Sequence, residues 1–284
     1  MSECIKQVMM SERTSMKVGG PAAEFYEPDY ESGFVDCLNS LQNVFILGNG
    51  TNVIVRDGGY PGAVVSTLKA LTGISIEGEK LVCGAGESLA RVCRYAAEHN
   101  LAGLEELSGI PGTVGGAVFM NAGAYDSEIA SVVVSVKAYD MHNENIIMLT
   151  NADCEFGYRT STFKNKPLII LSAVLLLKPG AREEIEAKMA NYTRKRNEKQ
   201  PVDMPSAGSF FKRPDGDFAG RLIEAAGMKG ARVGGALVSE KHAGFIVNTG
   251  GATAADVIAL SEEIKQKVFE MSGIILEEEP VIIG

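Results

Sequence analysis

The stretch GLEELSGIPGTVGGAVFMNAGAY, residues 103–125, says most about the fold of this chain. Its glycines and its proline are unlike an ordinary helix or strand, so we expect a long loop between a helix and a strand. An ordered loop of this length and composition usually serves a function. The stretch suits a backbone cradle against a large flat or phosphorylated ligand. The alternative, a flexible linker, is disfavoured because it would expose six apolar side chains: Leu107, Ile110, Val114, Val118, Phe119 and Met120.

Composition bounds the class of protein. The chain has 284 residues, of which 45% are hydrophobic, so we expect a globular protein of about two domains. The net charge is −9 and the isoelectric point is near 5.0. This balance disfavours a nucleic-acid partner, because neutralising phosphates requires a basic surface.

Membrane insertion, secretion and metal binding are also disfavoured. The longest apolar run, residues 168–177, falls short of the roughly 18 residues that a membrane span needs, and it indicates a buried strand. The amino terminus lacks a basic segment followed by an apolar one, so we expect a cytoplasmic protein without a secretory signal. The five cysteines form no CxxC pair and the three histidines show no ligand spacing, so we expect neither disulfides nor a metal site.

Apolar patterns predict both strands and helices. Strands are expected at 43–47, 52–55, 62–66, 131–140, 145–149 and 168–177, with a hairpin turn at 140–145. Helices are expected at 87–103, 181–200, 217–227 and 254–273, the first of them stopped by Gly103. Thr253 and Asp256 resemble a capping box at the start of the last helix. A final strand is expected at 274–284.

The composition changes after KPG, residues 178–180, to that of a charged helix. We place the domain boundary there, which gives domains at 15–180 and 181–284. The amino-terminal domain then contains the glycine-rich stretches, and the carboxy-terminal domain contains the last two predicted helices.

A second glycine-rich stretch, LGNGTNVIV at residues 47–55, runs from one predicted strand into another. Glycine at positions 48 and 50 allows positive φ and close backbone approach, and successive N–H groups in such a turn can bind an anion. Thr51 and Asn52 add side-chain donors. A hairpin without any ligand is an equally good interpretation. The stretch is neither a Walker loop nor a GxGxxG fingerprint.

Two stretches carry single side chains that are suited to chemistry. In GYRTSTFK, residues 157–164, Arg159 is either a surface charge at a turn or a charge aimed at a ligand. In MPSAGSFFKRP, residues 204–214, Ser209 is an acid or nucleophile tuned by Lys212, or a turn serine satisfied by the backbone.

The last stretch, LEEEP at residues 276–280, places three carboxylates in the expected final strand. If that strand alternates, Glu277 and Glu279 share a face. One interpretation is a solvated edge. The other is a buried carboxylate whose pKa is raised and which can donate a proton.

In this order, and with RTSMKVGGPA near the start and VGGALVSEKHAGFIVN at 233–248, these stretches resemble the UDP-N-acetylenolpyruvoylglucosamine reductase family. The resemblance extends from about Thr14 to Gly284. It implies the FAD-binding fold of the vanillyl-alcohol-oxidase type, built of two α+β subdomains, and a carboxy-terminal α+β domain for a UDP-sugar. It also implies non-covalent FAD, NADPH as hydride donor, and the reduction that completes UDP-N-acetylmuramic acid for peptidoglycan.

The resemblance further implies roles for single residues. Arg159 would contact the flavin and the substrate carboxylate, Ser209 would donate a proton, and Glu279 would assist from the other side. Since a free serine is a weak acid, we expect Lys212 or ordered water to help Ser209. FAD would contact Gly48, Asn49, Gly50, Thr51 and Asn52, and also Ile110, Pro111, Gly112, Thr113, Gly115, Gly116, Asn121, Gly123, Ala124 and Tyr125. The substrate would contact Tyr158, Lys212 and Arg213.

The chain departs from the family pattern in three ways. Arg213 stands where many members have asparagine, so a sugar or diphosphate contact differs there. Pro280 stands where valine is usual, and because proline lacks the N–H donor it suggests an edge position. The short separation of Arg159 from Ser209 indicates the form of the family without a tyrosine-loop insert.

Two other classes of function fit parts of the sequence. An oxidase of sugars or alcohols with the same fold would bind FAD and react with oxygen. A nucleotide-sugar or flavin binder without catalysis would have no need of a proton donor such as Ser209. We expect a monomer.

Overall fold

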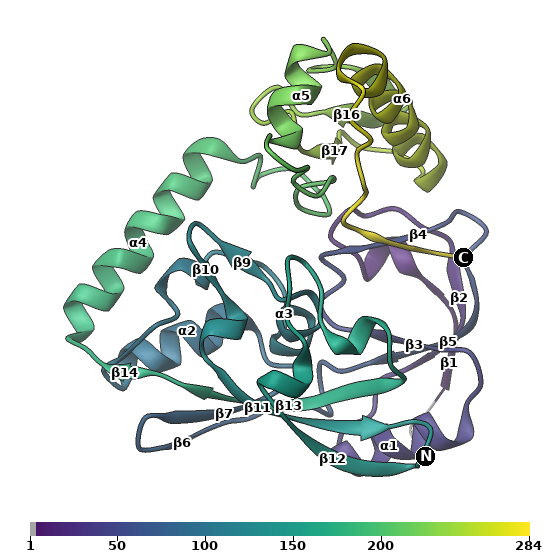
Figure 1. The fold of residues 1–284 in the computed structure, drawn as a ribbon. Helices are drawn as coiled ribbons and strands as arrows, with labels where there is room; N and C mark the ends of the chain where they lie inside the picture. The colour runs from purple at the N-terminus through teal and green to yellow at the C-terminus, as the bar shows by residue number, and fades with distance from the viewer. Residues whose placement is uncertain (1–3) are drawn as a thin grey trace. The chain divides into compact units, whose positions relative to one another are not determined.

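A computed structural model describes residues 4–284, and it divides into two compact units (Figure 1). Unit 1 consists of residues 24–49 and 62–195 together with Cys4 and Ile5. Unit 2 consists of Lys6–Ala23, Gly50–Pro61 and Arg196–Gly284. The compact units therefore differ from the expected domains at 15–180 and 181–284, because two early segments belong with the carboxy-terminal third.

Unit 1 is built on a five-stranded antiparallel sheet. Its strands, in spatial order, are β12 (Asn145–Thr150), β11 (Val133–Asp140), β13 (Leu168–Leu176), β7 (Lys80–Gly84) and β6 (Ile74–Glu77). The predicted hairpin turn between β11 and β12 is confirmed, and the Asp140 carboxylate accepts the backbone N–H groups of His142 and Asn143 in it. The long apolar run is the central strand β13, which is why it is so rich in β-branched and leucine residues.

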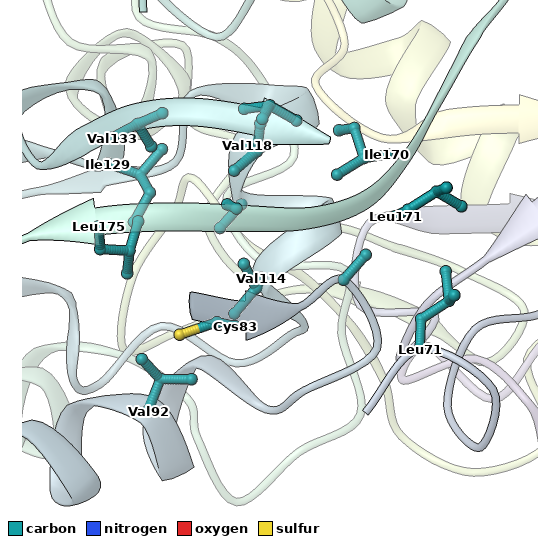
Figure 2. Packing of buried hydrophobic residues seen from close by; sticks show 14 of the residues in the cluster. Leu71, Cys83, Val92, Val114, Val118, Ile129, Val133, Ile170, Leu171 and Leu175 are labelled. Carbon is teal, nitrogen blue, oxygen red and sulfur yellow. The ribbon is translucent and has the colours of Figure 1, made fainter. Parts of the chain in front are cut away.

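Two helices cover this sheet with apolar side chains. They are α2 (Leu89–Glu98) and α3 (Val114–Met120). Figure 2 shows Val92 of α2 and Val114 and Val118 of α3 in one buried cluster with residues of β7 and β13. The predicted stop at Gly103 is wrong: α2 ends at Glu98, and Asn100 takes the left-handed conformation with φ 58°.

A second sheet has four strands in the order β1 (Cys4–Met9), β2 (Pro21–Tyr26), β5 (Tyr60–Ser66) and β3 (Val44–Leu47). The division between the units falls inside β1, β2 and β5. Within unit 1, β3 pairs with β5 in parallel, and α1 (Glu31–Ser40) buries Phe34, Cys37 and Leu38 in the cluster of Figure 2. Four short strands complete the unit: β8 (Leu101–Ala102), β9 (Gly123–Ala124), β10 (Ser127–Glu128) and β14 (Lys178–Pro179).

Unit 2 has its own core of buried apolar residues. Its elements are α5 (Ala219–Ala225), α6 (Ala254–Ser272), the three-stranded sheet β15 (Arg232–Val233), β16 (Ala236–Val238) and β17 (Ile246–Asn248), and the parallel pair β4 (Val53–Val55) and β18 (Val281–Ile283). The capping box of Thr253 and Asp256 is confirmed. The charged helix α4 (Arg182–Lys199) contains a boundary between the units, because its residues up to Lys195 belong to unit 1 and those from Arg196 belong to unit 2. Among residues 4–284, no helix is both long and apolar enough to cross a bilayer.

Candidate active site

The glycine-rich stretch contains a short helix, so the expectation of a continuous loop is wrong. Thr113 caps α3, and its Oγ1 accepts the N–H of Gly116 at 3.2 Å. The N–H groups of Val114 and Gly115 donate to the carbonyls of Glu87 and Ala85 at 2.9 and 2.8 Å. These amide N–H groups therefore already donate to carbonyl groups of unit 1, and they are not available to bind a phosphate at the amino terminus of α3.

The two glycines of α3 face different surroundings. A Cβ at Gly115 would lie 2.9 Å from the Ala85 Cβ and 3.0 Å from the Ala85 carbonyl oxygen, so only glycine fits there. Gly116 is exposed, and a Cβ there would meet only Thr113 Oγ1 at 3.5 Å. Gly115 thus serves packing, whereas Gly116 presents bare backbone to the surface.

The two glycine-rich stretches meet within unit 1. A Cβ at Gly48 would lie 2.7 Å from Thr113 Oγ1, so the absence of a side chain lets the start of the 48–52 loop approach α3. The strand–loop–strand arrangement predicted around that loop is confirmed by β3 and β4. Gly112 has φ 135°, and its carbonyl oxygen accepts a hydrogen bond from the N–H of Leu89 at 3.0 Å.

The GYR motif is a tight turn. Gly157 and Thr160 exchange two backbone hydrogen bonds of 3.1 and 3.2 Å. Arg159, inside the turn, has φ 53° in the left-handed region. An L-residue with a Cβ adopts this region at a cost of about 1–2 kcal/mol, and such strain is common at functional positions.

Three hydrogen bonds attach this turn to the end of the glycine-rich stretch. Asn121 Nδ2 donates to Gly157 O at 2.9 Å, an Arg159 NH2 group donates to Gly123 O at 3.1 Å, and Ser161 Oγ donates to Phe119 O at 2.7 Å. The structure thereby brings Arg159 against the stretch that was expected to bind the flavin.

Asn121 has a structural role that differs from the expected cofactor contact. It is fully buried at φ 44°, at the carboxyl end of α3. Its amide donates to Gly157, and its Oδ1 accepts the Ala130 N–H at 3.1 Å. With both ends of the side chain engaged, Asn121 holds the turn.

Three tyrosines are connected to this arrangement. Tyr125 is half exposed at φ 58°, and its hydroxyl donates to Tyr192 O at 2.9 Å while the two rings lie 4.5 Å apart. The Tyr192 hydroxyl donates to Glu106 Oε1 at 2.9 Å, which raises the pKa of Tyr192. The Tyr158 ring lies 5.2 Å from the Arg159 guanidinium carbon. Sequence reasoning missed Tyr192, because a single tyrosine in a charged helix gives no signal.

In unit 2, the rest of the 48–52 loop meets the LEEEP segment. Asn52 Nδ2 donates to Glu279 O at 3.2 Å, and the Val281 N–H donates to Asn52 O at 2.9 Å. Gly50 fits closely, since a Cβ there would lie 2.2 Å from Arg13 O. Two stretches that the sequence marked separately are therefore in contact.

Ser209 and Glu279 lie on neighbouring segments of unit 2. The Glu279 N–H donates to Phe210 O at 2.9 Å, and the Lys212 N–H donates to Glu277 O at 2.8 Å, with Phe211 and Glu278 bridged between them. Phe210 and Phe211 are buried, while Ser209 is exposed. The two buried rings anchor the turn that presents the Ser209 hydroxyl.

The final strand is shorter than expected, because only Val281–Ile283 pair in β18. Glu277 is exposed, and Lys212 Nζ lies 2.8 Å from its carboxylate and lowers its pKa. Glu278 accepts the Ser261 hydroxyl at 2.7 Å and pairs with Lys265. Glu279 is half-buried.

The remaining expected substrate residue, Arg213, lies on the surface of unit 2. Its Nε donates to Asp217 O at 3.3 Å, and its guanidinium carbon lies 4.1 Å from the centre of the Phe218 ring. Within residues 4–284, no group of three or more His, Cys, Asp or Glu side chains is arranged to hold a metal ion.

Comparison with known proteins identifies the class first. Residues 34–149 match the family described as FAD binding domain. The fold is similar to that of a solvent-stable cholesterol oxidase, with a TM-score of 0.50 and 16% identity, over 63% of this chain and 38% of that one. The chain is an α+β flavoprotein that binds FAD, as the sequence predicted.

Closer relatives identify the family. Residues 200–283 match the family described as UDP-N-acetylenolpyruvoylglucosamine reductase, C-terminal domain. A protein from Caldanaerobacter subterraneus named UDP-N-acetylenolpyruvoylglucosamine reductase is 47% identical to this chain, and the match covers 97% of this chain and 92% of that protein. A protein of the same name from Clostridium botulinum is 44% identical, and that match covers 97% of this chain and 90% of the relative. The crystal structure of the Thermus caldophilus enzyme gives a TM-score of 0.85 at 35% identity over 100% of both chains. This chain belongs to the UDP-N-acetylenolpyruvoylglucosamine reductase family.

Proposed function

We infer that this chain carries out the reaction of its family. It reduces UDP-N-acetylglucosamine enolpyruvate to UDP-N-acetylmuramate, a peptidoglycan precursor, with FAD as cofactor and NADPH as hydride donor. The substrates are small molecules of the nucleotide-sugar and nicotinamide classes. Since these are cytoplasmic compounds, the proposal places the enzyme in the cytoplasm, acting as a monomer.

The observation that carries the proposed site is the attachment of the Arg159 turn to residues 119–123. A left-handed arginine in a turn that three hydrogen bonds hold in place is a costly arrangement, and folding alone does not require an arginine there. It aims a permanently charged, planar group beside the stretch proposed to bind the flavin.

The described residues fit FAD in a particular way. Because the first amides of α3 are bonded inside unit 1, the phosphates would be held by the unit 1 end of the 48–52 loop, at Gly48 and Asn49. The flat ring system would lie along the bare backbone of Gly116 and beside residues Gly123–Tyr125. FAD, when bound, accepts hydride from NADPH and passes it to the terminal alkene carbon of the substrate.

Arg159 would act on the charge that this hydride transfer creates. Addition at the terminal carbon pushes electron density toward the enolpyruvyl carboxylate, in an enolate-like arrangement. A guanidinium can hold both carboxylate oxygens at once and remains charged at any working pH. Stabilising charge where it develops is usually the largest single contribution to catalysis.

Ser209 would then protonate the neighbouring carbon, with Glu279 assisting from the adjacent segment. The backbone hydrogen bond from Glu279 to Phe210 fixes the distance between the two segments. Because a serine hydroxyl is a weak acid, this step needs help. Lys212 is paired with Glu277, so its assistance requires that this exposed pair opens; ordered water is the other source.

Separate measurement of the two half-reactions tests the role of Ser209. In Ser209→Ala, NADPH should reduce the flavin at the wild-type rate, while the sugar should reoxidise it about 10²–10⁴-fold more slowly, the scale of a lost general acid. Ser272→Ala is the matched control, because that hydroxyl lies in the same unit, where it donates to Val268 O and accepts the Ile274 N–H at the end of α6. Equal slowing of both half-reactions in Ser209→Ala would contradict the proposed role.

A further inference from the structure

A short chain of hydrogen bonds connects His242 to the segment that carries Ser209. The Phe210 N–H donates to Gly244 O at 2.8 Å, and the Gly244 N–H donates to Nδ1 of His242 at 3.1 Å. Phe210 is completely buried and directly follows Ser209. The position of the imidazole is therefore transmitted through one residue, Gly244, to the backbone beside the Ser209 hydroxyl.

The His242 ring is itself held in place by its surroundings. Its Cε1 lies so close to Gly220 of α5 that a Cβ there would be 3.2 Å away, and its face meets the Phe245 ring edge to face at 5.1 Å. The backbone N–H groups of Lys241 and His242 donate to Ser239 Oγ at 3.2 and 3.3 Å. A ring packed on two sides and fixed at its backbone is a defined anchor for Gly244.

The bond to Gly244 exists only while His242 is neutral. Nδ1 can accept a hydrogen bond when the ring proton is on Nε2, and an imidazolium has no acceptor. Burial is the largest influence on the His242 pKa and lowers it; Lys229 adds to this, while a backbone hydrogen bond and Glu224 oppose it. Lys229 and Glu224 pair at 3.0 Å, and the neighbouring Lys241 donates to Asn197 O.

We propose that His242 is a positioning residue for proton transfer: by accepting the Gly244 N–H, it fixes the Gly244 carbonyl, and with it Phe210 and the Ser209 hydroxyl. This inference rests on the role of Ser209 given above. It does not require His242 to touch substrate, because a displacement of about 1 Å at a proton donor is enough to slow a reaction by roughly 10²-fold.

Three substitutions at position 242 test the proposal. Asparagine places an acceptor oxygen near the position of Nδ1, glutamine places one near Nε2, and alanine provides none. In His242→Ala and His242→Gln, reoxidation of the reduced flavin by the enolpyruvyl sugar should slow about 10–100-fold, while reduction by NADPH stays unchanged. His242→Asn should recover most of the rate. Flavin content and thermal midpoint, measured for each variant, show that the fold is intact.

The pH dependence separates positioning from packing. Because burial lowers the His242 pKa, its neutral form is complete above the ordinary value of about 6.5 and is lost as the pH falls through the lowered value. The wild-type rate of the sugar half-reaction should fall there relative to His242→Asn, which has no such titration. An unchanged rate ratio across that range, or equal rescue by glutamine and asparagine, would overturn the inference.

Ser209→Ala in the same assay distinguishes the two proposals. If Ser209→Ala slows the sugar half-reaction and His242→Ala does not, the inference about His242 fails while the proposed function stands. If Ser209→Ala leaves that half-reaction unchanged, the proposed proton donor fails first, and the positioning role of His242 fails with it.

Discussion

Arg159 adopts a backbone conformation that an arginine reaches only at a cost. Its φ of 53° is one of several left-handed non-glycine values in unit 1, and two others, at Asn121 and Tyr125, lie in the stretch to which its turn is attached. Asparagine tolerates this region because its short side chain can bond locally, whereas arginine and tyrosine have no such compensation. Because several strained residues lie around one arginine, we interpret Arg159 as a residue that serves function and not stability.

Substitutions at Arg159 should therefore separate stability from activity. Arg159→Ala should lower turnover about 10²–10³-fold, and Arg159→Lys should not restore it, because lysine lacks the planar fork. Arg159→Gly should be equally inactive, yet its free energy of unfolding should exceed that of Arg159→Ala by about 1 kcal/mol, since glycine relieves the left-handed strain. Steady-state kinetics and denaturant unfolding measure the two effects, with Lys166→Ala as an exposed control in the same segment. Wild-type turnover in the lysine variant would contradict the account.

At the scale of elements, α3 is the part of the site that sequence reasoning missed. The signal was present: Thr113 is a good cap, and Val114, Ala117 and Val118 have helical spacing. The density of glycines concealed it, because glycine lowers helix propensity regardless of context. Contact with Ala85, which is distant in the sequence, requires the glycine at 115, and no local pattern shows this.

The two glycines of α3 provide a matched pair of substitutions. Gly115→Ala should destabilise the apoprotein by about 1–3 kcal/mol, because the new Cβ would overlap Ala85. Gly116→Ala should leave stability unchanged or raise it by up to about 1 kcal/mol, since alanine favours the helix and the site is exposed. If FAD lies along Gly116, that variant should nevertheless bind FAD more weakly. Denaturant unfolding and FAD titration measure these effects, and equal stability of the two variants would refute the packing role of Gly115.

The sequence predicted the class, the family and most strands correctly, and it marked Arg159, Ser209 and Glu279, whose roles remain predictions. The sequence could not show that the Asn121 side chain donates a hydrogen bond to the GYR turn or that Lys212 pairs with Glu277. Both interactions depend on contacts between segments far apart in the chain. The expected length of the final strand was also wrong, because only Val281–Ile283 pair in β18. The chain there is held by backbone bonds to residues 210–212, which local periodicity cannot reveal.

At the scale of the whole molecule, unit 2 is assembled from three separate segments. The Asp57 carboxylate accepts the N–H groups of Ala254 and Ala255 at the start of α6, and Asn248 Nδ2 donates to Met16 O. These contacts join the early segments to the carboxy-terminal third, and the predicted boundary at residue 180 could not include them. The polypeptide around Ser209 and Glu279 therefore depends on residues near the amino terminus.

The visible spectrum of the purified protein, followed without oxygen, tests the central claim most directly. The account predicts a yellow protein that bleaches when NADPH is added and regains its colour when UDP-N-acetylglucosamine enolpyruvate follows, with UDP-N-acetylmuramate as the product. UDP-N-acetylglucosamine, which lacks the enolpyruvyl group, is the control and should leave the flavin reduced. A flavin that stays bleached in the presence of the enolpyruvyl sugar and recovers only with oxygen would contradict the account and indicate an oxidase.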